Sequence, residues 1–209
     1  MKIAVVASNG KASQAIIAEL IARGHTVTGF ARSENKSAVQ NFVQKDIMAL
    51  TKEDLAGFDA VVDGFGAFTP ETLPLHTQTS QHLADLVAGT NTRLYIGGGA
   101  GSLYVDPSHK VQLLDTPEFP AAFYALAEAQ TEELAALRSR TDAKWVFVSP
   151  AADFRADGEK TGKYILGGEE LTLSAAGESV ISYADYAVGM VDLIESGAHI
   201  GERVSLVQA

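Results

Sequence analysis

The residues whose types and spacing could bind a charged ligand lie in one loop near the N-terminus, "ASNGKAS" at positions 7–13. Within it, Gly10 lets backbone N–H groups approach an anion closely, and Lys11 adds a positive charge. Ser8 offers a hydroxyl donor, and Asn9 tolerates a positive φ better than most residues. Such a loop between a strand and a helix predicts a pyrophosphate site. The loop residues that we expect to contact the ligand are Ser8, Asn9, Gly10, Lys11 and Ala12.

Two small residues, Ala7 and Ser13, stand where dinucleotide-binding loops usually carry glycine. Their size still permits close packing, and a turn with only a structural role is the alternative. Arg32, at the end of the second predicted strand, would suit the 2′-phosphate of NADP(H), whereas an acid there would favour NAD(H). A solvated arginine at a strand end is the other interpretation. Asp46, after the third predicted strand, could accept from an adenine amino group or cap a turn.

Two later segments, "DGFG" (63–66) and "IGGGAG" (96–101), close the fourth and fifth predicted strands at the same edge of the sheet. Glycine lets the backbone lie directly against a ligand, although tight turns would also explain these residues. The residues that we expect to line the ligand there are Gly64, Phe65, Gly66, Gly98 and Gly99.

Strand-like and helix-like segments alternate along the chain. This predicts an α/β fold, a Rossmann-like doubly wound parallel sheet with helices on both faces. We expect strands near 3–6, 25–31, 42–46, 59–66 and 93–99, a further strand from 144 that Pro150 closes, and helices over 12–23, 72–88 and 120–138.

The tail adds a small C-terminal elaboration. We expect a hairpin around Gly167 and Gly168, a helix with Ser182 as N-cap and Asp185 in the capping box, and a last strand at 202–208. No linker or repeat interrupts the chain, so residues 1–209 form one domain.

Composition narrows the classes of function. The net charge of −10 disfavours nucleic-acid binding, and the absence of cysteine removes thiolate chemistry and disulfides. No apolar run approaches the roughly 20 residues that a membrane span needs, so we expect a cytoplasmic protein without a membrane partner. His76 and His82 are six residues apart and do not share a helix face, so we expect no metal site. A monomer and a homodimer are both open.

Further segments follow the first loop in a recognisable order: "GGAGSL" (98–103), "DTPEFP" (115–120), "FVSPAADF" (147–154), "GEKTGKY" (158–164) and "ISYADYAV" (181–188). With them, the sequence resembles the atypical short-chain dehydrogenase/reductase family, in particular the NADH-flavin reductases related to biliverdin-IXβ/flavin reductase. The resemblance implies that Asp46 and Ile47 frame the adenine, and that Pro150 and Ala151 line the nicotinamide half. The biliverdin branch has histidine where this chain has Ala151, which argues against that substrate.

Short-chain dehydrogenases usually transfer a proton through a tyrosine followed four residues later by lysine. None of the six tyrosines here has that partner. Tyr124 lies nearest the expected place, but the residue four positions on is Glu128. Ser102 could donate a hydrogen bond to a substrate carbonyl or cap a turn. A carbonyl reductase with Tyr124 as its acid is therefore one alternative function.

Flavin reduction fits the absence of a tyrosine–lysine pair, because the protein need only align two rings and the flavin can take its one proton from water. We expect an NADP(H)-dependent oxidoreductase, with NAD(H) open, that reduces free FMN or FAD or a quinone-like acceptor. An NADP(H)-binding redox sensor without turnover and a decayed cofactor site are alternatives. The expected shelf for the acceptor ring consists of Phe65, Phe68, Phe123, Tyr124 and Phe154, and the candidate cations for a flavin phosphate are Arg155, Lys160 and Lys163.

Overall fold

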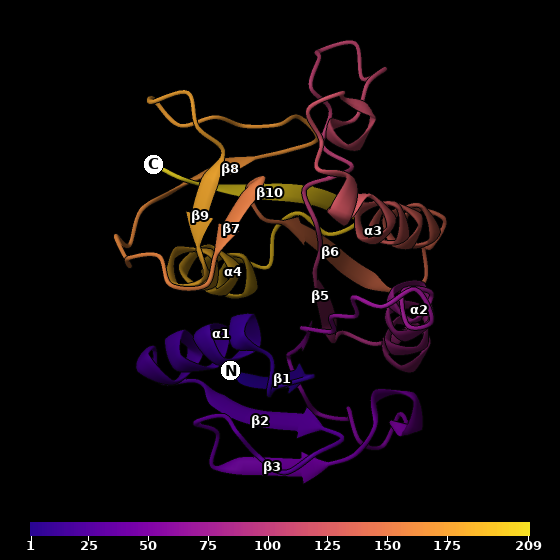
Figure 1. Ribbon diagram of the computed structural model, residues 1–209. Coiled ribbons are helices and arrows are strands. Elements are labelled where there is room, and N and C mark those ends of the chain that lie inside the picture. Colours follow the sequence, from indigo (N-terminus) through magenta and orange to yellow (C-terminus); the bar gives the residue numbers. More distant parts are fainter.

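The computed structural model describes all 209 residues and contains an eight-stranded sheet in the order β3-β2-β1-β4-β5-β6-β10-β8 (Figure 1). Every pairing in this sheet is parallel except that of β8, which runs antiparallel to β10. The strands are β1 (Lys2–Val6), β2 (Thr26–Ala31), β3 (Asn41–Gln44), β4 (Ala60–Asp63), β5 (Arg93–Gly97), β6 (Lys144–Ser149), β8 (Tyr164–Gly167) and β10 (Glu202–Gln208), with β7 (Asp153–Arg155) and β9 (Val180–Ser182) in a separate parallel pair. The helices are α1 (Lys11–Ala22), α2 (Leu75–Val87), α3 (Tyr124–Arg138) and α4 (Tyr183–Ser196).

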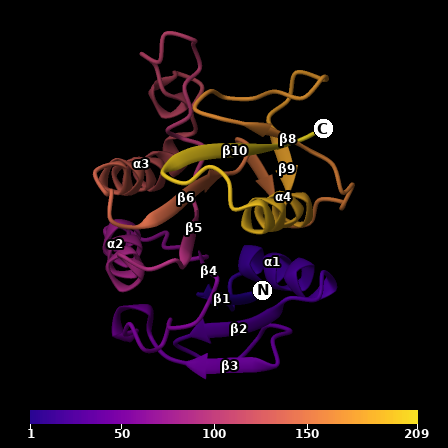
Figure 2. The same cartoon turned by 180° about the vertical axis from the view of Figure 1, so that it is seen from behind.

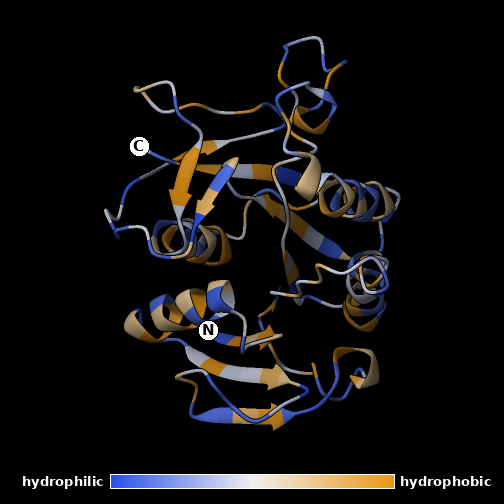
Figure 3. Ribbon diagram, viewed as in Figure 1, coloured by the Kyte–Doolittle hydropathy of each residue, from blue (hydrophilic) through white to orange (hydrophobic).

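The helices cover both faces of the sheet, which confirms the predicted Rossmann-like α/β fold. Helices α1 and α4 pack together on one face, and α2 and α3 pack together on the other (Figures 1 and 2). Successive residues of a strand point alternately into the two hydrophobic cores, one on each face of the sheet. Val5 and Val62 belong to the core under α1 and α4, whereas Val6 and Val61 belong to the core under α2 and α3. Hydrophobic and hydrophilic residues lie side by side on each helix, as expected for helices with one buried side (Figure 3).

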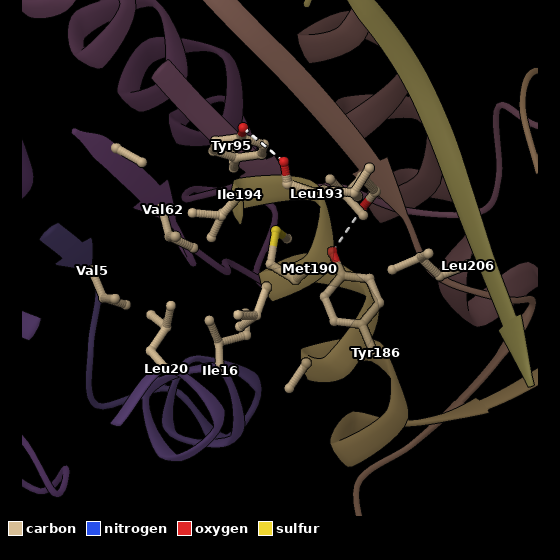
Figure 4. Packing of buried hydrophobic residues seen from close by; sticks show 14 of the residues in the cluster. Val5, Ile16, Leu20, Val62, Tyr95, Tyr186, Met190, Leu193, Ile194 and Leu206 are labelled. Carbon is tan, nitrogen blue, oxygen red and sulfur yellow. Dashed lines mark hydrogen bonds between the residues drawn. The ribbon is translucent and has the colours of Figure 1, made fainter. Parts of the chain in front are cut away.

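Two buried tyrosines join α4 to the sheet (Figure 4). The hydroxyl of Tyr95 on β5 donates to the backbone oxygen of Leu193 at 3.1 Å, and that of Tyr186 on α4 donates to the oxygen of Val148 at 2.8 Å. Burial raises the pKa of both phenols, so they stay protonated donors. These bonds fix α4 against the strands whose ends form the site.

The predicted N-cap of α4 is confirmed, because Ser182 Oγ accepts from the backbone N–H of Asp185 at 3.0 Å. The carboxylate of Asp185 does not complete a capping box. It is buried and accepts instead from the N–H groups of Thr161 and Gly162 at 2.9 Å and 2.7 Å. Asp185 therefore anchors the loop before β8, a role that local sequence could not indicate.

The predicted hairpin around Gly167 and Gly168 is wrong. β8 ends at Gly167 and pairs with β10, and the following residues do not return as a second strand. Glu169 is instead held by Arg203 of β10, whose Nη2 lies 2.6 Å from Oε2 and 2.9 Å from the backbone oxygen of Glu169. A buried guanidinium needs such a partner, and this ion pair outweighs the local turn tendency of the two glycines.

Candidate functional site

The carboxyl ends of the parallel strands open on one cleft with a volume of about 1560 Å³, the usual place for a ligand in an open α/β sheet. The arrowheads of β1, β2 and β3 point to the same side in Figure 1. We call the lining residues within 6–16, 30–33 and 45–48 the N-terminal half of the cleft. Those within 63–79, 97–130, 150–154 and 179–186 form the C-terminal half.

Most of the predicted ligand contacts line this cleft. They are Asn9, Gly10, Lys11, Ala12, Arg32, Asp46, Ile47, Gly64, Phe65, Gly66, Gly98, Gly99, Pro150 and Ala151. Three predicted site residues, Ser8, Ser102 and Tyr124, do not line it.

The N-terminus of α1 faces the cleft without a side-chain cap. Its N-cap is Gly10, and there is no acidic residue in the first turn. The first bond of the helix runs from the N–H of Gln14 to the oxygen of Gly10 at 2.9 Å, so the amides of Lys11, Ala12 and Ser13 precede the helical ladder. Free amides at a positive helix end, with a lysine beside them, fit a pyrophosphate.

The backbone strain in this loop lies at Ala7, not at Asn9. Ala7 has a φ of 54°, the left-handed region that favours glycine. Asn9 instead ties the loop to the segment after β2. Its Nδ2 donates to the backbone oxygen of Glu34 at 2.8 Å, and its Oδ1 accepts from the N–H of Lys36 at 2.8 Å. Asn9 therefore couples the two segments that form the N-terminal half.

The two serines of the loop face inward. Ser8 is fully buried against Gly29 of β2, so the prediction that its hydroxyl reaches the ligand is wrong. Ser13 stands where a glycine usually allows the helix to approach the strand, and its hydroxyl lies against Gly64. A Cβ on Gly64 would overlap Ser13 Oγ. Glycine at residue 64 thus supplies the space that Ser13 takes up.

The loops after β2 and β3 bring Arg32 and Asp46 to the same half. Arg32 is exposed, lines the cleft and makes no ion pair, so its guanidinium is available to a ligand. Asp46 caps a turn, which is the second of the two roles expected from the sequence. Its Oδ1 accepts from the N–H of Met48 at 2.9 Å at the start of the 3₁₀ turn Ile47–Ala49. Asp46 also lines the cleft.

The C-terminal half is rich in aromatic side chains. The Phe65 ring packs edge-on against His76, with centroids 5.3 Å apart, and Phe154 packs against Tyr183 at 4.2 Å. Phe68 and Phe123 are 78% and 58% exposed at the cleft. Rings so placed offer stacking surface to a planar ligand.

A cluster of ionisable residues lies buried behind this half. Asp63, at the end of β4, is 1% exposed, and one of its oxygens has no partner. Burial raises its pKa to about 6. Burial, with the charge of Asp63, raises the pKa of Glu133 on α3, whose Oε2 lies 3.8 Å from Nδ1 of His76. His76 Nε2 lies 3.1 Å from the oxygen of Ala67, and burial lowers its pKa.

Sequence reasoning missed Asp63 and Glu133. Asp63 was visible as a carboxylate that ends an apolar strand, but Glu133 looked like one of several solvated helix acids. Only the packing of α3 on the sheet shows that its carboxyl is buried.

Neither predicted catalytic side chain lines the cleft. Ser102 is buried, and its hydroxyl and backbone oxygen lie 3.4 Å and 3.2 Å from the guanidinium of Arg203. Tyr124 is exposed at the first residue of α3, beyond the lining formed by Phe123. The roles expected for Tyr124 as acid and for Ser102 as hydrogen-bond donor stay predictions.

Comparison with known proteins gives concordant results for the fold and cofactor class. A family model described as NAD(P)H-binding matches residues 8–196. The protein YwnB of Bacillus subtilis (strain 168), which is uncharacterized, is 40% identical over 99% of this chain and 98% of its own.

Two solved structures are also similar over the whole chain. One, from Streptococcus pneumoniae TIGR4, is named "a putative NADH-flavin reductase"; it is 55% identical over 100% of both chains, with a TM-score of 0.98. Another, from Bacteroides thetaiotaomicron, is named a "putative epimerase"; it is 32% identical over 99% of this chain and 96% of its own, with a TM-score of 0.87.

Two further structural findings bear on the kind of site. No group of three His, Cys, Asp or Glu side chains is placed to hold a metal ion. No helix combines the length and the apolar character that crossing a membrane requires.

Proposed function

Because this chain belongs to the NAD(P)H-binding family, we propose that it is an oxidoreductase that passes a hydride from NADPH to a planar acceptor such as a free flavin. The observation that carries this proposal is the division of the cleft. One half offers free helix amides and an unpaired arginine, and the other offers exposed aromatic rings.

The N-terminal half would hold the adenosine diphosphate part of the cofactor. The amides at the start of α1 and the Lys11 ammonium would bind the pyrophosphate, and Arg32 would bind the 2′-phosphate. Ile47 would pack against the adenine, with Asp46 at its edge. The glycine-rich loops after β4 and β5 would leave room for the nicotinamide. When bound, NADPH would supply the hydride and leave as NADP⁺.

The C-terminal half would orient the acceptor. Phe68 and Phe123 present ring surface on which a flat acceptor can stack, and Phe65 is held in place by His76. Alignment of two rings is enough for hydride transfer to a flavin, which takes its one proton from water. This chemistry needs no tyrosine acid, in keeping with Tyr124 lying outside the cleft lining.

The comparisons support the reaction class. The streptococcal relative is named for flavin reduction with NADH, whereas Arg32 is our reason to expect NADPH. The cytoplasmic location and the monomer or homodimer expected from the sequence stay predictions.

The proposal is tested by following the absorbance of NADPH with purified protein and a range of flavin concentrations, with NADH in parallel. We expect saturation in both substrates and faster turnover with NADPH. NADPH binding, measured by the change in its fluorescence, without consumption would overturn the proposal and favour the redox-sensor alternative.

A further inference from the structure

The charged side chains of the cleft are divided between its halves. Among the lining residues, every lysine and arginine lies in the N-terminal half: Lys11, Arg32 and Lys45. The C-terminal half contains two exposed acids, Glu118 and Asp153, together with the buried Asp63 and the neutral His76. The acceptor half of the cleft therefore offers no cation.

From this division, and resting on the proposed function, we infer that the acceptor is an uncharged planar ring system without a phosphate group. A dephosphorylated flavin and a simple quinone share this chemistry, and FMN does not.

The cations that the sequence offered for a flavin phosphate are engaged elsewhere. Arg155 pairs with Asp153, with Nε 2.8 Å and Nη2 2.6 Å from Oδ2. Lys160 pairs with Glu19 of α1 at 2.5 Å. Lys163 does not line the cleft. Arg155 thus offsets the charge of Asp153, which leaves Glu118 as the exposed lining acid of this half without an ion pair.

The apolar surface of the same half suits an uncharged ring. Phe68 packs against the backbone at Gly66, with ring atoms 3.6 Å from where a Cβ would stand, and exposes most of its surface. Phe123 is also mainly exposed, and Phe119 and Leu126 line the wall beside it. Stacking on such rings covers apolar surface and requires no charge on the ligand.

A comparison of riboflavin with FMN isolates the effect of the phosphate group on the rate, because the two flavins have the same ring system. With NADPH saturating, we expect kcat/KM for riboflavin to exceed that for FMN by about tenfold at low ionic strength. The ratio should fall at high ionic strength, because salt screens the acids from the phosphate. A neutral naphthoquinone should also be reduced.

A pair of charge reversals tests the origin of the ratio. Glu118→Lys, within the lining, should lower the riboflavin-to-FMN ratio severalfold. Glu128→Lys changes the net charge equally from an exposed position of α3 that does not line the cleft, and it should leave the ratio unchanged.

The outcomes separate this inference from the function on which it rests. Reduction of FMN as fast as riboflavin, or faster at low salt, overturns the inference and leaves the flavin reductase intact. NADPH binding with no reduction of riboflavin, FMN or the quinone overturns the proposed function, and the inference falls with it. The ratio measured on the unaltered protein decides the matter even if a variant fails to fold.

Discussion

The two halves of the cleft differ in whether glycine is kept at the positions where the backbone would approach a ligand. In the N-terminal half, two positions where glycine is usual carry side chains: Ala7 adopts a left-handed φ, and Ser13 occupies the space that Gly64 leaves. In the C-terminal half the glycines remain, and a Cβ on Gly98 would enter the ring of Phe147. A side chain can thus replace glycine at residue 13, where Gly64 leaves space for it. It cannot do so at residue 98, where the packed ring of Phe147 fills that space.

The largest expected effect is at Gly98. Gly98→Ala should lower the free energy of unfolding by about 3 kcal/mol, because the fully buried Phe147 has no free space into which to move. Gly99→Ala is the matched control, since the nearest atoms to its Cβ are the end of the Gln130 side chain, which can rotate away. Urea denaturation of both variants measures the difference. Equal losses would show that the core does not distinguish the two positions.

A second prediction concerns Asp63, an acid that the C-terminal half buries, whereas the N-terminal half exposes Arg32. Asp63 has a folded pKa of about 6 against an ordinary value of 3.8. The native state therefore favours the protonated acid, and stability falls as pH rises from about 4 to about 6. Asp63→Asn removes this cost and can still accept from the N–H of Phe65. The variant should be more stable by roughly 3 kcal/mol at about pH 8 and nearly equal to the unaltered protein at about pH 4.

The measurement is a denaturation midpoint series across that pH range. A stability difference that does not change with pH would contradict a titrating Asp63. Glu133→Gln is a useful companion, because burial and Asp63 also raise the pKa of Glu133 and its amide would keep the same shape.

The contact between Ser13 and Gly64 gives a double-mutant test. Gly64→Ala should cost about 2 kcal/mol, because its Cβ overlaps the Ser13 hydroxyl. In the presence of Ser13→Gly, the nearest remaining neighbour is the backbone oxygen of Val6 at 3.3 Å, and most of the loss should be recovered. A coupling energy of about 1 kcal/mol or more between the two changes would support the compensation. Simple additivity would refute it.

Arg32 tests which cofactor the N-terminal half prefers. Arg32→Ala should raise KM for NADPH about tenfold, because a charge-assisted contact to the 2′-phosphate is lost, and should leave KM for NADH nearly unchanged. Steady-state rates with both cofactors measure this. Equal effects on the two would remove the basis for expecting NADPH.

The smallest expected effect is a gain. Ala7→Gly should stabilise the fold by up to about 1 kcal/mol, because glycine adopts a φ of 54° without the steric cost of a Cβ. The net gain is limited by the greater freedom of glycine in the unfolded chain. Thermal unfolding of the variant measures the gain, and a loss of stability would show that Ala7 is not strained.

Local pattern was enough for most of the fold. Apolar periodicity located the parallel strands and the four helices, and hydroxyl chemistry located the cap at Ser182. The local pattern was wrong in the tail, where it predicts a hairpin after β8. The path of the chain there depends on an ion pair between Arg203 and Glu169, which are more than thirty residues apart in sequence. A long-range ion pair leaves no periodic signal in sequence.

The candidate site shows the same limit. Glycines and Arg32 could be placed because the ends of parallel strands meet at one edge of a sheet. The depth of a side chain could not be predicted. Ser8 points into the sheet, Ser102 is held by Arg203, and the carboxyl of Glu133 is buried, because the packing of neighbouring elements decides each of these orientations.

The bonds made by Asn9 bear on how the cofactor preference could be redesigned. Asn9 holds Glu34 and Lys36 through their backbone atoms. The side chains of Glu34 and Lys36 can therefore be exchanged without releasing the loop, whereas the Ser33 hydroxyl accepts from Asn9 Nδ2 at 3.1 Å and belongs to the anchor. An engineer who replaced Arg32 with an acid to switch the preference would alter the chemistry of a fixed scaffold, provided that Asn9 and the length of the segment were kept.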